Sequence, residues 1–217
     1  MTFLSRTAQF IFTFFALSIG NNVLAQDNEM SDYRRKNENV LKMREKDIRS
    51  DLSTFTYGGI EERIGKAALN VILPRSYNDK EIYFEGNDIK VIITKGVFDP
   101  SKYKLGYEEK HLVKINNRPF YGGYGSLPRS TIEAITVIIK NDTIAIPPAS
   151  FADLYNPSFA YRDEQGTLRS LNGVYLSADG RKVYIYLLNR DASANYEVTW
   201  VIQDNKYLRR ALDYDLF

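Results

Sequence analysis

Eight carboxylate side chains fall in or beside the loops that the sequence predicts, and two of them together could carry acid–base chemistry. A glycoside hydrolase needs only two carboxyl groups that face each other about 5–9.5 Å apart. Most loop carboxylates cap turns or face solvent, and the sequence does not show which of them converge. A small carboxylate-dependent hydrolase acting on glycans is therefore the alternative interpretation. The eight are Asp99, Glu108, Glu109, Asp153, Asp163, Glu164, Asp191 and Asp213.

Other reactive groups are scarce. The chain has no cysteine and one histidine, which excludes thiol nucleophiles, zinc ribbons, disulfides and multi-histidine metal sites. His111 stands at the entrance to a predicted strand, a position more typical of an exposed residue than of a general base. The glycine cluster at 122–125 lacks the third glycine of a dinucleotide-binding loop. We therefore predict no catalytic residue, no metal site and no cofactor, and we favour a protein that is not an enzyme.

Tyrosine is the feature of the composition that could indicate function, with 16 residues in the chain. A flat ring with a hydroxyl at its tip suits a binding surface. The densest aromatic segment supplies our candidate ligand-binding residues, Arg118, Phe120, Tyr121 and Tyr124. For this segment by itself, however, we favour a tight connection, whose rings fold back onto the sheet, over a ligand surface. The favoured function is a non-catalytic domain that binds a protein or a glycan through aromatic loops.

The elements that would position these residues are strands. Runs rich in isoleucine, valine, tyrosine and threonine recur after Ser53, and their close spacing favours antiparallel pairing. Two-residue turns are predicted at Asn141-Asp142, Asp179-Gly180 and Asp204-Asn205. The only helical signal in this region runs from Pro147 to Tyr155 and predicts one or two turns that plug a sandwich. The fold class is therefore mainly β, an antiparallel β-sandwich-like domain with one short helix.

The last predicted hairpin can be followed face by face. If Gln203 pairs with Lys206, Trp200 stands opposite Arg209 on the core face. We expect the guanidinium to lie over the indole as a cation–π pair, which is a structural role.

The region before the strands is highly charged. Leu41, Ile48, Leu52 and Phe55 fall at spacings that align them on one side of a helix. This segment either docks on a partner or on the domain, or is a solvated and partly helical leader. We favour the leader, because four apolar residues bury little. Residues 26–53 are accordingly predicted as a charged leader or linker, and residues 54–217 as a single antiparallel β domain.

Residues 1–25 have the three parts of a secretory signal peptide. A cationic start precedes an apolar run from Phe10 to Ile19 that is too short to span a bilayer, and Val23-Leu24-Ala25 provides a cleavage site. We predict a periplasmic or extracellular protein with no transmembrane segment in the mature chain. A net charge of +2 argues against a nucleic-acid partner. The sequence leaves the oligomeric state open.

Several stretches carry a resemblance. Asp99-Pro100-Ser101-Lys102, the segment from Asp153 to Pro157, and the segments from Tyr196 to Gln203 and from Lys206 to Arg210 resemble a set of small exported β-rich proteins of unknown function from Gram-negative bacteria. The resemblance would cover most of the predicted domain. It implies export and a β-rich fold, and it supplies no activity, cofactor or site residue.

Overall fold

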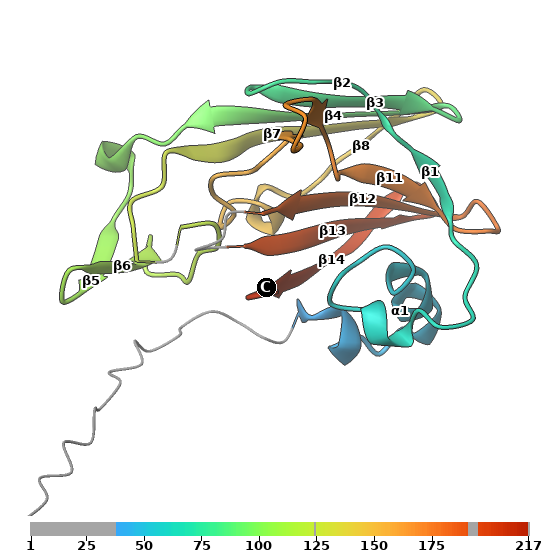
Figure 1. The fold of residues 1–217 in the computed structure, drawn as a ribbon, viewed down its shortest axis with the longest axis horizontal. Helices are drawn as coiled ribbons and strands as arrows, with labels where there is room; N and C mark the ends of the chain where they lie inside the picture. Colours follow the sequence, from blue (N-terminus) through green and yellow to red (C-terminus); the bar gives the residue numbers. More distant parts are fainter. Residues whose placement is uncertain (1–37, 124, 191–194, 217) are drawn as a thin grey trace, which may run out of the picture. The chain divides into compact units, whose positions relative to one another are not determined.

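Two five-stranded sheets form the framework of the structure, a computed structural model that describes residues 38–123, 125–190 and 195–216 (Figure 1). These residues belong to the second of the two units into which the chain divides, Asp32–Phe217. All strand pairs between named strands in the described residues are antiparallel. The predicted fold class, a mainly β and antiparallel sandwich-like domain, is confirmed.

The first sheet has the order β1-β11-β12-β13-β14 and the second the order β2-β3-β4-β7-β8. The first consists of β1 (Asn70–Ile72), β11 (Gly173–Leu176), β12 (Lys182–Asn189), β13 (Tyr196–Gln203) and β14 (Lys206–Tyr214). The second consists of β2 (Pro74–Tyr77), β3 (Glu81–Gly86), β4 (Ile89–Val97), β7 (Ser130–Ile139) and β8 (Asp142–Ile144). Two ribbons complete the strands, β5 (Leu105–Glu108) with β6 (His111–Ile115), and β9 (Tyr161–Arg162) with β10 (Leu168–Arg169).

Helical structure is short. Within the described residues the one α-helix is α1 (Lys46–Leu52), and the named 3₁₀ turns are η2 (Val40–Lys42), η3 (Ile60–Glu62), η4 (Pro100–Lys102) and η5 (Pro148–Ser150). The signal at 147–155 thus forms a single 3₁₀ turn. Phe151 and Leu154, which follow this turn, are buried in the main core, as expected for a plug.

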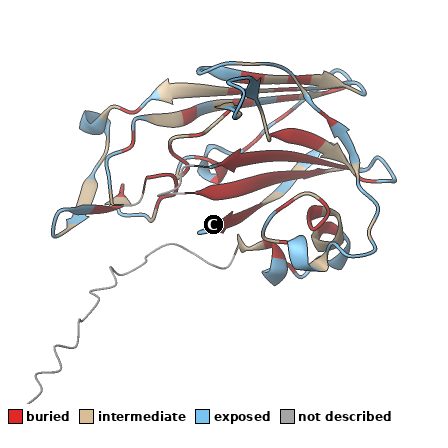
Figure 2. Cartoon of the chain, viewed as in Figure 1, coloured by how far each residue is buried: buried red, intermediate tan, exposed pale blue. Residues whose placement is uncertain are grey.

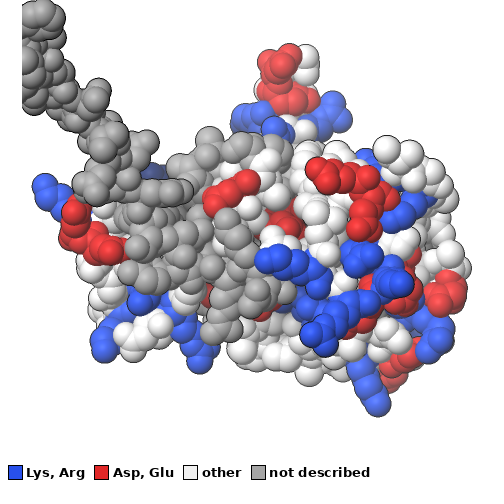
Figure 3. All heavy atoms as spheres, turned by 90° about the horizontal axis from the view of Figure 1, so that it is seen from below, with Lys and Arg blue, Asp and Glu red and all other residues white. Residues whose placement is uncertain are grey.

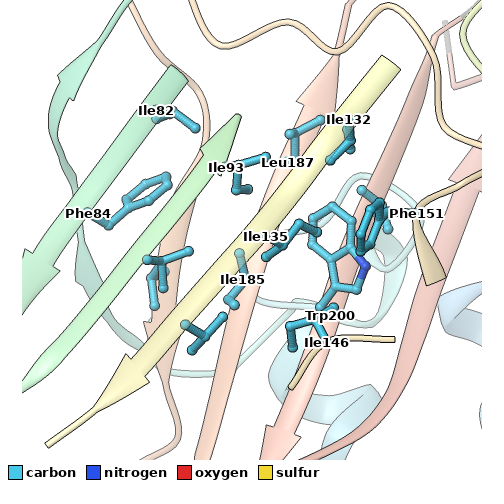
Figure 4. Packing of buried hydrophobic residues seen from close by; sticks show 14 of the residues in the cluster. Ile82, Phe84, Ile93, Ile132, Ile135, Ile146, Phe151, Ile185, Leu187 and Trp200 are labelled. Carbon is cyan, nitrogen blue, oxygen red and sulfur yellow. The ribbon is translucent and has the colours of Figure 1, made fainter. Parts of the chain in front are cut away.

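The main core lies between the two sheets. Alternate residues of β3, β4 and β7 meet alternate residues of β12 and β13 in one cluster, since successive side chains of a strand point to opposite faces. Trp200 is fully buried there and lies close to Phe151 (Figure 4). Burying such side chains contributes about 1.5–3 kcal/mol each and is the main source of stability in a chain without disulfides.

A second hydrophobic cluster covers the outer face of the first sheet. Val40, Met43, Ile48 and Leu52 are buried against residues of β12, β13 and β14, namely Tyr184, Val201 and Ala211. Residues 38–62 therefore form a layer of their own on this face, where α1 lies in Figure 1. Our preference for a solvated leader was wrong for residues 38–53, because the sheet offers them an apolar face. The strands β12 and β13 are consequently buried on both sides (Figure 2).

The predicted hairpins form with small shifts. The connection between β11 and β12 is longer than the predicted two-residue turn and spans residues 177–181, with Gly180 at positive φ and Leu176 opposite Val183 as expected. Asp204-Asn205 closes β13 and β14 with positive φ at both residues. The turn between β7 and β8 begins one residue earlier than predicted, at Lys140 with φ 58°. Val137 therefore faces Ile144 instead of Ile146. Because the pairing shifts by two residues, the side chains predicted to point into the core still do so.

The predicted pairing of Trp200 with Arg209 was wrong. The register of β13 and β14 shifts between Val201 and Ile202, so that Leu208 is an extra residue on β14 and Trp200 faces Arg210. A β-bulge of this kind moves every later residue to the other face. Arg210 therefore points inward, whereas Arg209 pairs with Val201 on the outer face.

Candidate functional site

A groove of about 760 Å³ runs along β14. Four consecutive residues of β14, from Tyr207 to Arg210, line it. Tyr207 and Arg210 pair with the inward-facing Ile202 and Trp200, whereas Arg209 pairs with Val201 on the outer face. A groove that contacts all three of these β14 residues therefore follows the edge of the strand and not one face. The opposite wall comes from Arg118-Pro119 and from the segment between Pro147 and Asp153.

The strand β14 is the last strand of the first sheet, and β13 is its only neighbour in it. An edge strand directs about half of its backbone N–H and C=O groups away from its neighbour, where another extended chain can pair with them. The groove therefore borders hydrogen-bonding backbone as well as side chains.

Two of the groove's arginines are held by carboxylates. Arg210 makes a bidentate pair with Asp153, at 2.6 and 2.7 Å, and a further bond of 2.7 Å to Glu38. Burial opposes the charge of Arg210, but the two carboxylates outweigh it and raise its pKa. Arg209 bonds to both oxygens of Glu45, at 3.1 and 3.0 Å. Each groove carboxylate is thus neutralised by a guanidinium.

Arg118 differs from these two arginines. Its side chain is exposed at the groove, and no hydrogen bond or ion pair to it is found within the described residues. A second hollow of about 350 Å³ shares Arg118, Pro119, Ala149 and Asp153 with the groove and extends it toward Tyr155. Arg118 therefore stands at the junction of the two hollows, where an anionic group could reach it.

The aromatic candidates lie inside the fold. Phe120 and Tyr121 are only 1% and 2% exposed. The Phe120 ring meets Tyr155 edge to face, at 5.8 Å between centroids, and the Tyr121 ring lies 5.3 Å from that of Tyr214. The interpretation as an exposed aromatic surface was thus wrong for these two rings: Tyr121 packs in the main core, and Phe120 packs in a smaller cluster with Ile115 and Tyr155. Tyr124 lies outside the described residues.

Backbone contacts explain why this segment is buried. Tyr121 donates its N–H to Asp153 O and accepts from Tyr155 N–H, both at 2.9 Å. Gly122 follows with φ 87°, and a Cβ there would come within 1.9 Å of the Tyr155 oxygen. Backbone hydrogen bonds of this segment thus connect its loop to the loop of residues 153–155, and they place Arg118 at the groove.

The other loop carboxylates do not converge on the groove. Asp99 accepts the Ser101 N–H, and Asp163 accepts from Gln165 and Thr167, as turn-capping carboxylates do. Asp191 lies outside the described residues. The lone histidine, His111, is exposed on β6. Of the seven such carboxylates that the structure describes, only Asp153 lines the groove.

The structure contains a buried pair of acidic residues, of which the sequence indicated only Asp213 as a candidate. Glu197 on β13 and Asp213 on β14 are cross-strand partners on the outer face, 2% and 6% exposed. Burial is the main cause that raises the pKa of Glu197 to about 7, and burial also raises the pKa of Asp213. The pair lies beneath residues 38–62 and lines none of the hollows described above. Glu197 was missed because it lies within an apolar strand.

Metal and membrane features are limited in the same described residues. They contain no cluster of histidine and acidic side chains that could hold a metal ion, and none of their helices has the length and apolar character needed to cross a membrane. On the face shown in Figure 3, lysine and arginine side chains lie beside aspartate and glutamate ones.

No protein-family model matches the chain, and no curated protein or solved structure is significantly similar to it. The functional argument therefore depends on the geometry of the groove.

Proposed function

We propose that this chain is an exported, non-catalytic binding domain that takes up an extended polypeptide segment in the groove along β14. The observation that carries the proposal is that the edge strand β14 borders the groove over four consecutive residues. Recognition by strand addition uses such an edge, because backbone hydrogen bonds supply affinity and flanking side chains supply specificity.

The side chains favour a ligand with an acidic group. The Arg118 side chain is exposed and makes no hydrogen bond or ion pair within the described residues, whereas the groove's carboxylates are all paired. Edge strands of natural proteins often carry β-bulges and charged side chains, which prevent unspecific pairing with strands of other chains. In β14 these features are the bulge at Leu208 and the charges of Arg209 and Arg210. A ligand must match them, which gives the groove selectivity.

The ion pairs of the groove's carboxylates also support a binding function over hydrolysis of a glycan. A glycan hydrolase needs one carboxyl group that stays protonated to donate a proton and a second that acts as nucleophile or base. Asp153 and Glu45 each accept two hydrogen bonds from an arginine, which occupies the oxygens that such catalysis would need.

The proposal can be tested with labelled octapeptides in which valine alternates with glutamate, lysine or serine. We expect the glutamate peptide to bind the full mature chain and to shift the backbone amide NMR signals of residues 206–210. Arg118→Glu should weaken its binding by about tenfold or more. The matched control is Arg162→Glu on the β9–β10 ribbon, which contacts Tyr77 of β2 and not β14.

Two results would contradict the proposal: signals that move elsewhere while those of β14 stay fixed, or equal effects of the two charge reversals. Export has a separate test, because the intact mass of the protein recovered outside the cytoplasm should correspond to a chain that begins at Gln26.

A further inference from the structure

The acidic pair holds both ends of the layer formed by residues 38–62. Asp213 accepts the backbone N–H of Val40 at 3.0 Å and the side-chain amide of Asn39 at 2.6 Å. Glu197 accepts the backbone N–H groups of Tyr57 at 2.9 Å and of Gly58 at 2.6 Å. The two carboxyl groups, adjacent on neighbouring strands, therefore fasten two points of the layer to the sheet.

Gly58 shows how closely the layer approaches the pair. A Cβ at this position would stand 2.4 Å from Asp213 Cγ. Water is thereby kept from the carboxyl groups, and neither of them has a lysine or arginine partner in the described residues. Two adjacent carboxylates without a cation are costly to bury in the ionised form, so the closed layer favours protonation.

The groups that face the pair are few. Tyr186 of β12 donates its hydroxyl to Glu197 at 2.7 Å, and Tyr175 and Tyr57 lie beyond it. Burial raises the pKa of Glu197 to about 7, the charge of Asp213 adds to this, and the hydrogen bonds from Gly58, Tyr57 and Tyr186 oppose it.

The fastened layer also carries two walls of the groove. Glu38, next to Asn39, bonds to Arg210, and Glu45 bonds to Arg209. These carboxylates lie 172 and 164 residues away from their arginines in sequence, so the contacts exist only while the layer is docked. Its docking thus decides whether Arg209 is covered by Glu45 or available to a ligand, and whether Arg210 has one carboxylate partner, Asp153, or two.

We propose that Glu197 and Asp213 form a pH-sensitive latch that holds residues 38–62 over the sheet when protonated and lets this layer open locally when ionised. Opening removes Glu38 and Glu45 from the groove and frees Arg209 for an acidic ligand, whereas Arg210 loses Glu38 and keeps its bidentate pair with Asp153. The direction follows from burial, since the closed state binds the proton more tightly than the open state. The layer is therefore closed at acidic pH and opens more often above neutrality. Only the ligand part of this proposal rests on the proposed function.

Hydrogen exchange on the full mature chain tests the latch without a ligand. We expect the amides of Val40, Tyr57 and Gly58 to be less protected than that of Ile185 in β12, which identifies local opening. From about pH 5.5 to 8.5, their protection should fall by about tenfold or more after correction for the intrinsic exchange rate. Glu197→Gln, which keeps an acceptor and loses the charge, should remove most of this fall.

Asp213→Asn provides a second variant with a smaller expected effect, should the glutamine variant fail to fold. Two results would overturn the latch. Either the protection of these three amides stays constant with pH in the wild-type chain, or it falls by the same amount in a folded Glu197→Gln or Asp213→Asn variant.

Binding of the valine–glutamate octapeptide at about pH 6 and pH 8.5 tests the ligand part separately. Affinity should be higher at pH 8.5 by about tenfold, and Glu38→Gln with Glu45→Gln should raise it at pH 6. A latch that opens as expected while no octapeptide binds overturns the proposed function alone.

Discussion

Trp200 and Arg210 donate to one acceptor: the Ser150 carbonyl oxygen receives Trp200 Nε1 and Arg210 Nη1, each at 3.1 Å. Trp200 belongs to the core and Arg210 to the groove, so a single backbone oxygen joins the two. The loop that carries Ser150 is thereby fixed against β14, and Asp153 a few residues later meets Arg210.

Arg210→Ala should destabilise the fold. It would leave Asp153 and Glu38 without their main cation and remove one donor from the Ser150 carbonyl, and we expect a loss of about 3 kcal/mol. Urea denaturation measures the change. Arg181→Ala is the control, because its bidentate pair with Asp204 is exposed to solvent and should contribute little to stability. Equal losses in the two variants would refute the role of Arg210.

Gly122→Ala should be among the most damaging small substitutions. The residue has φ 87°, and the added Cβ would meet the Tyr155 oxygen at 1.9 Å. Gly180→Ala is a matched comparison, since it has φ 68° with no atom within 4 Å of the added Cβ. We expect Gly180→Ala to lower the free energy of unfolding by about 1–2 kcal/mol, because of the backbone conformation alone, and Gly122→Ala to lower it by more. The melting temperatures of the two variants would decide, and a similar shift in both would argue against the close contact.

Leu52→Ala tests whether the layer of residues 38–62 belongs to the fold. Leu52 is fully buried in the cluster with Tyr184 and Val201, and the truncation should cost about 2–5 kcal/mol. Leu41 in the same layer is 45% exposed, and Leu41→Ala should change the free energy of unfolding by about 0.5 kcal/mol or less. If both variants melt like the wild-type chain, the layer contributes nothing to stability.

Stability should depend on pH through Glu197. Its pKa rises from 4.5 to about 7 on folding, so its contribution is full below pH 4.5 and is lost as pH rises through about 7. We expect the free energy of unfolding to fall by up to about 3 kcal/mol between about pH 5 and pH 8. Denaturant titrations at several pH values measure this slope. A Glu197→Gln chain that keeps the slope would show that another group causes it.

The opposite trend is expected in acid. A hydrogen bond from Lys182 lowers the pKa of Asp47, and one from Arg209 helps to lower that of Glu45, whose largest cause is a backbone hydrogen bond. Groups of this kind contribute stability above their ordinary pKa and lose it as pH falls through the lowered value. Maximum stability should therefore lie on the mildly acidic side of neutrality.

Strands and tight turns could be predicted from the sequence because their signals are local. Asp204-Asn205 tolerates positive φ at both residues, and the turn formed where it was expected. The bulge at Leu208 has no such signal, since no glycine or special residue marks it, and so Arg209 and Arg210 were exchanged between the two faces. The groove depends on this exchange.

The docked layer was missed for a different reason. The charged segment has few apolar residues, and by themselves they do not indicate docking. The run from Val183 to Leu188 is apolar throughout, and a strand without alternation is typical of burial on both faces. This run could have indicated that some segment lies over the outer face. The groove itself could not have been predicted, because Arg118, Asp153 and Arg210 meet only through tertiary structure.

The contacts between residues 39–58 and the carboxyl groups on β13 and β14 also constrain the order of folding. The acceptors lie on the last two strands, more than a hundred residues after their donors. The layer has nothing to dock on until the final hairpin has paired with β12. Contacts of such large sequence separation require a long loop to close, which slows folding. A chain that has not been synthesised through β14 should therefore remain incompletely folded, with its early apolar residues exposed.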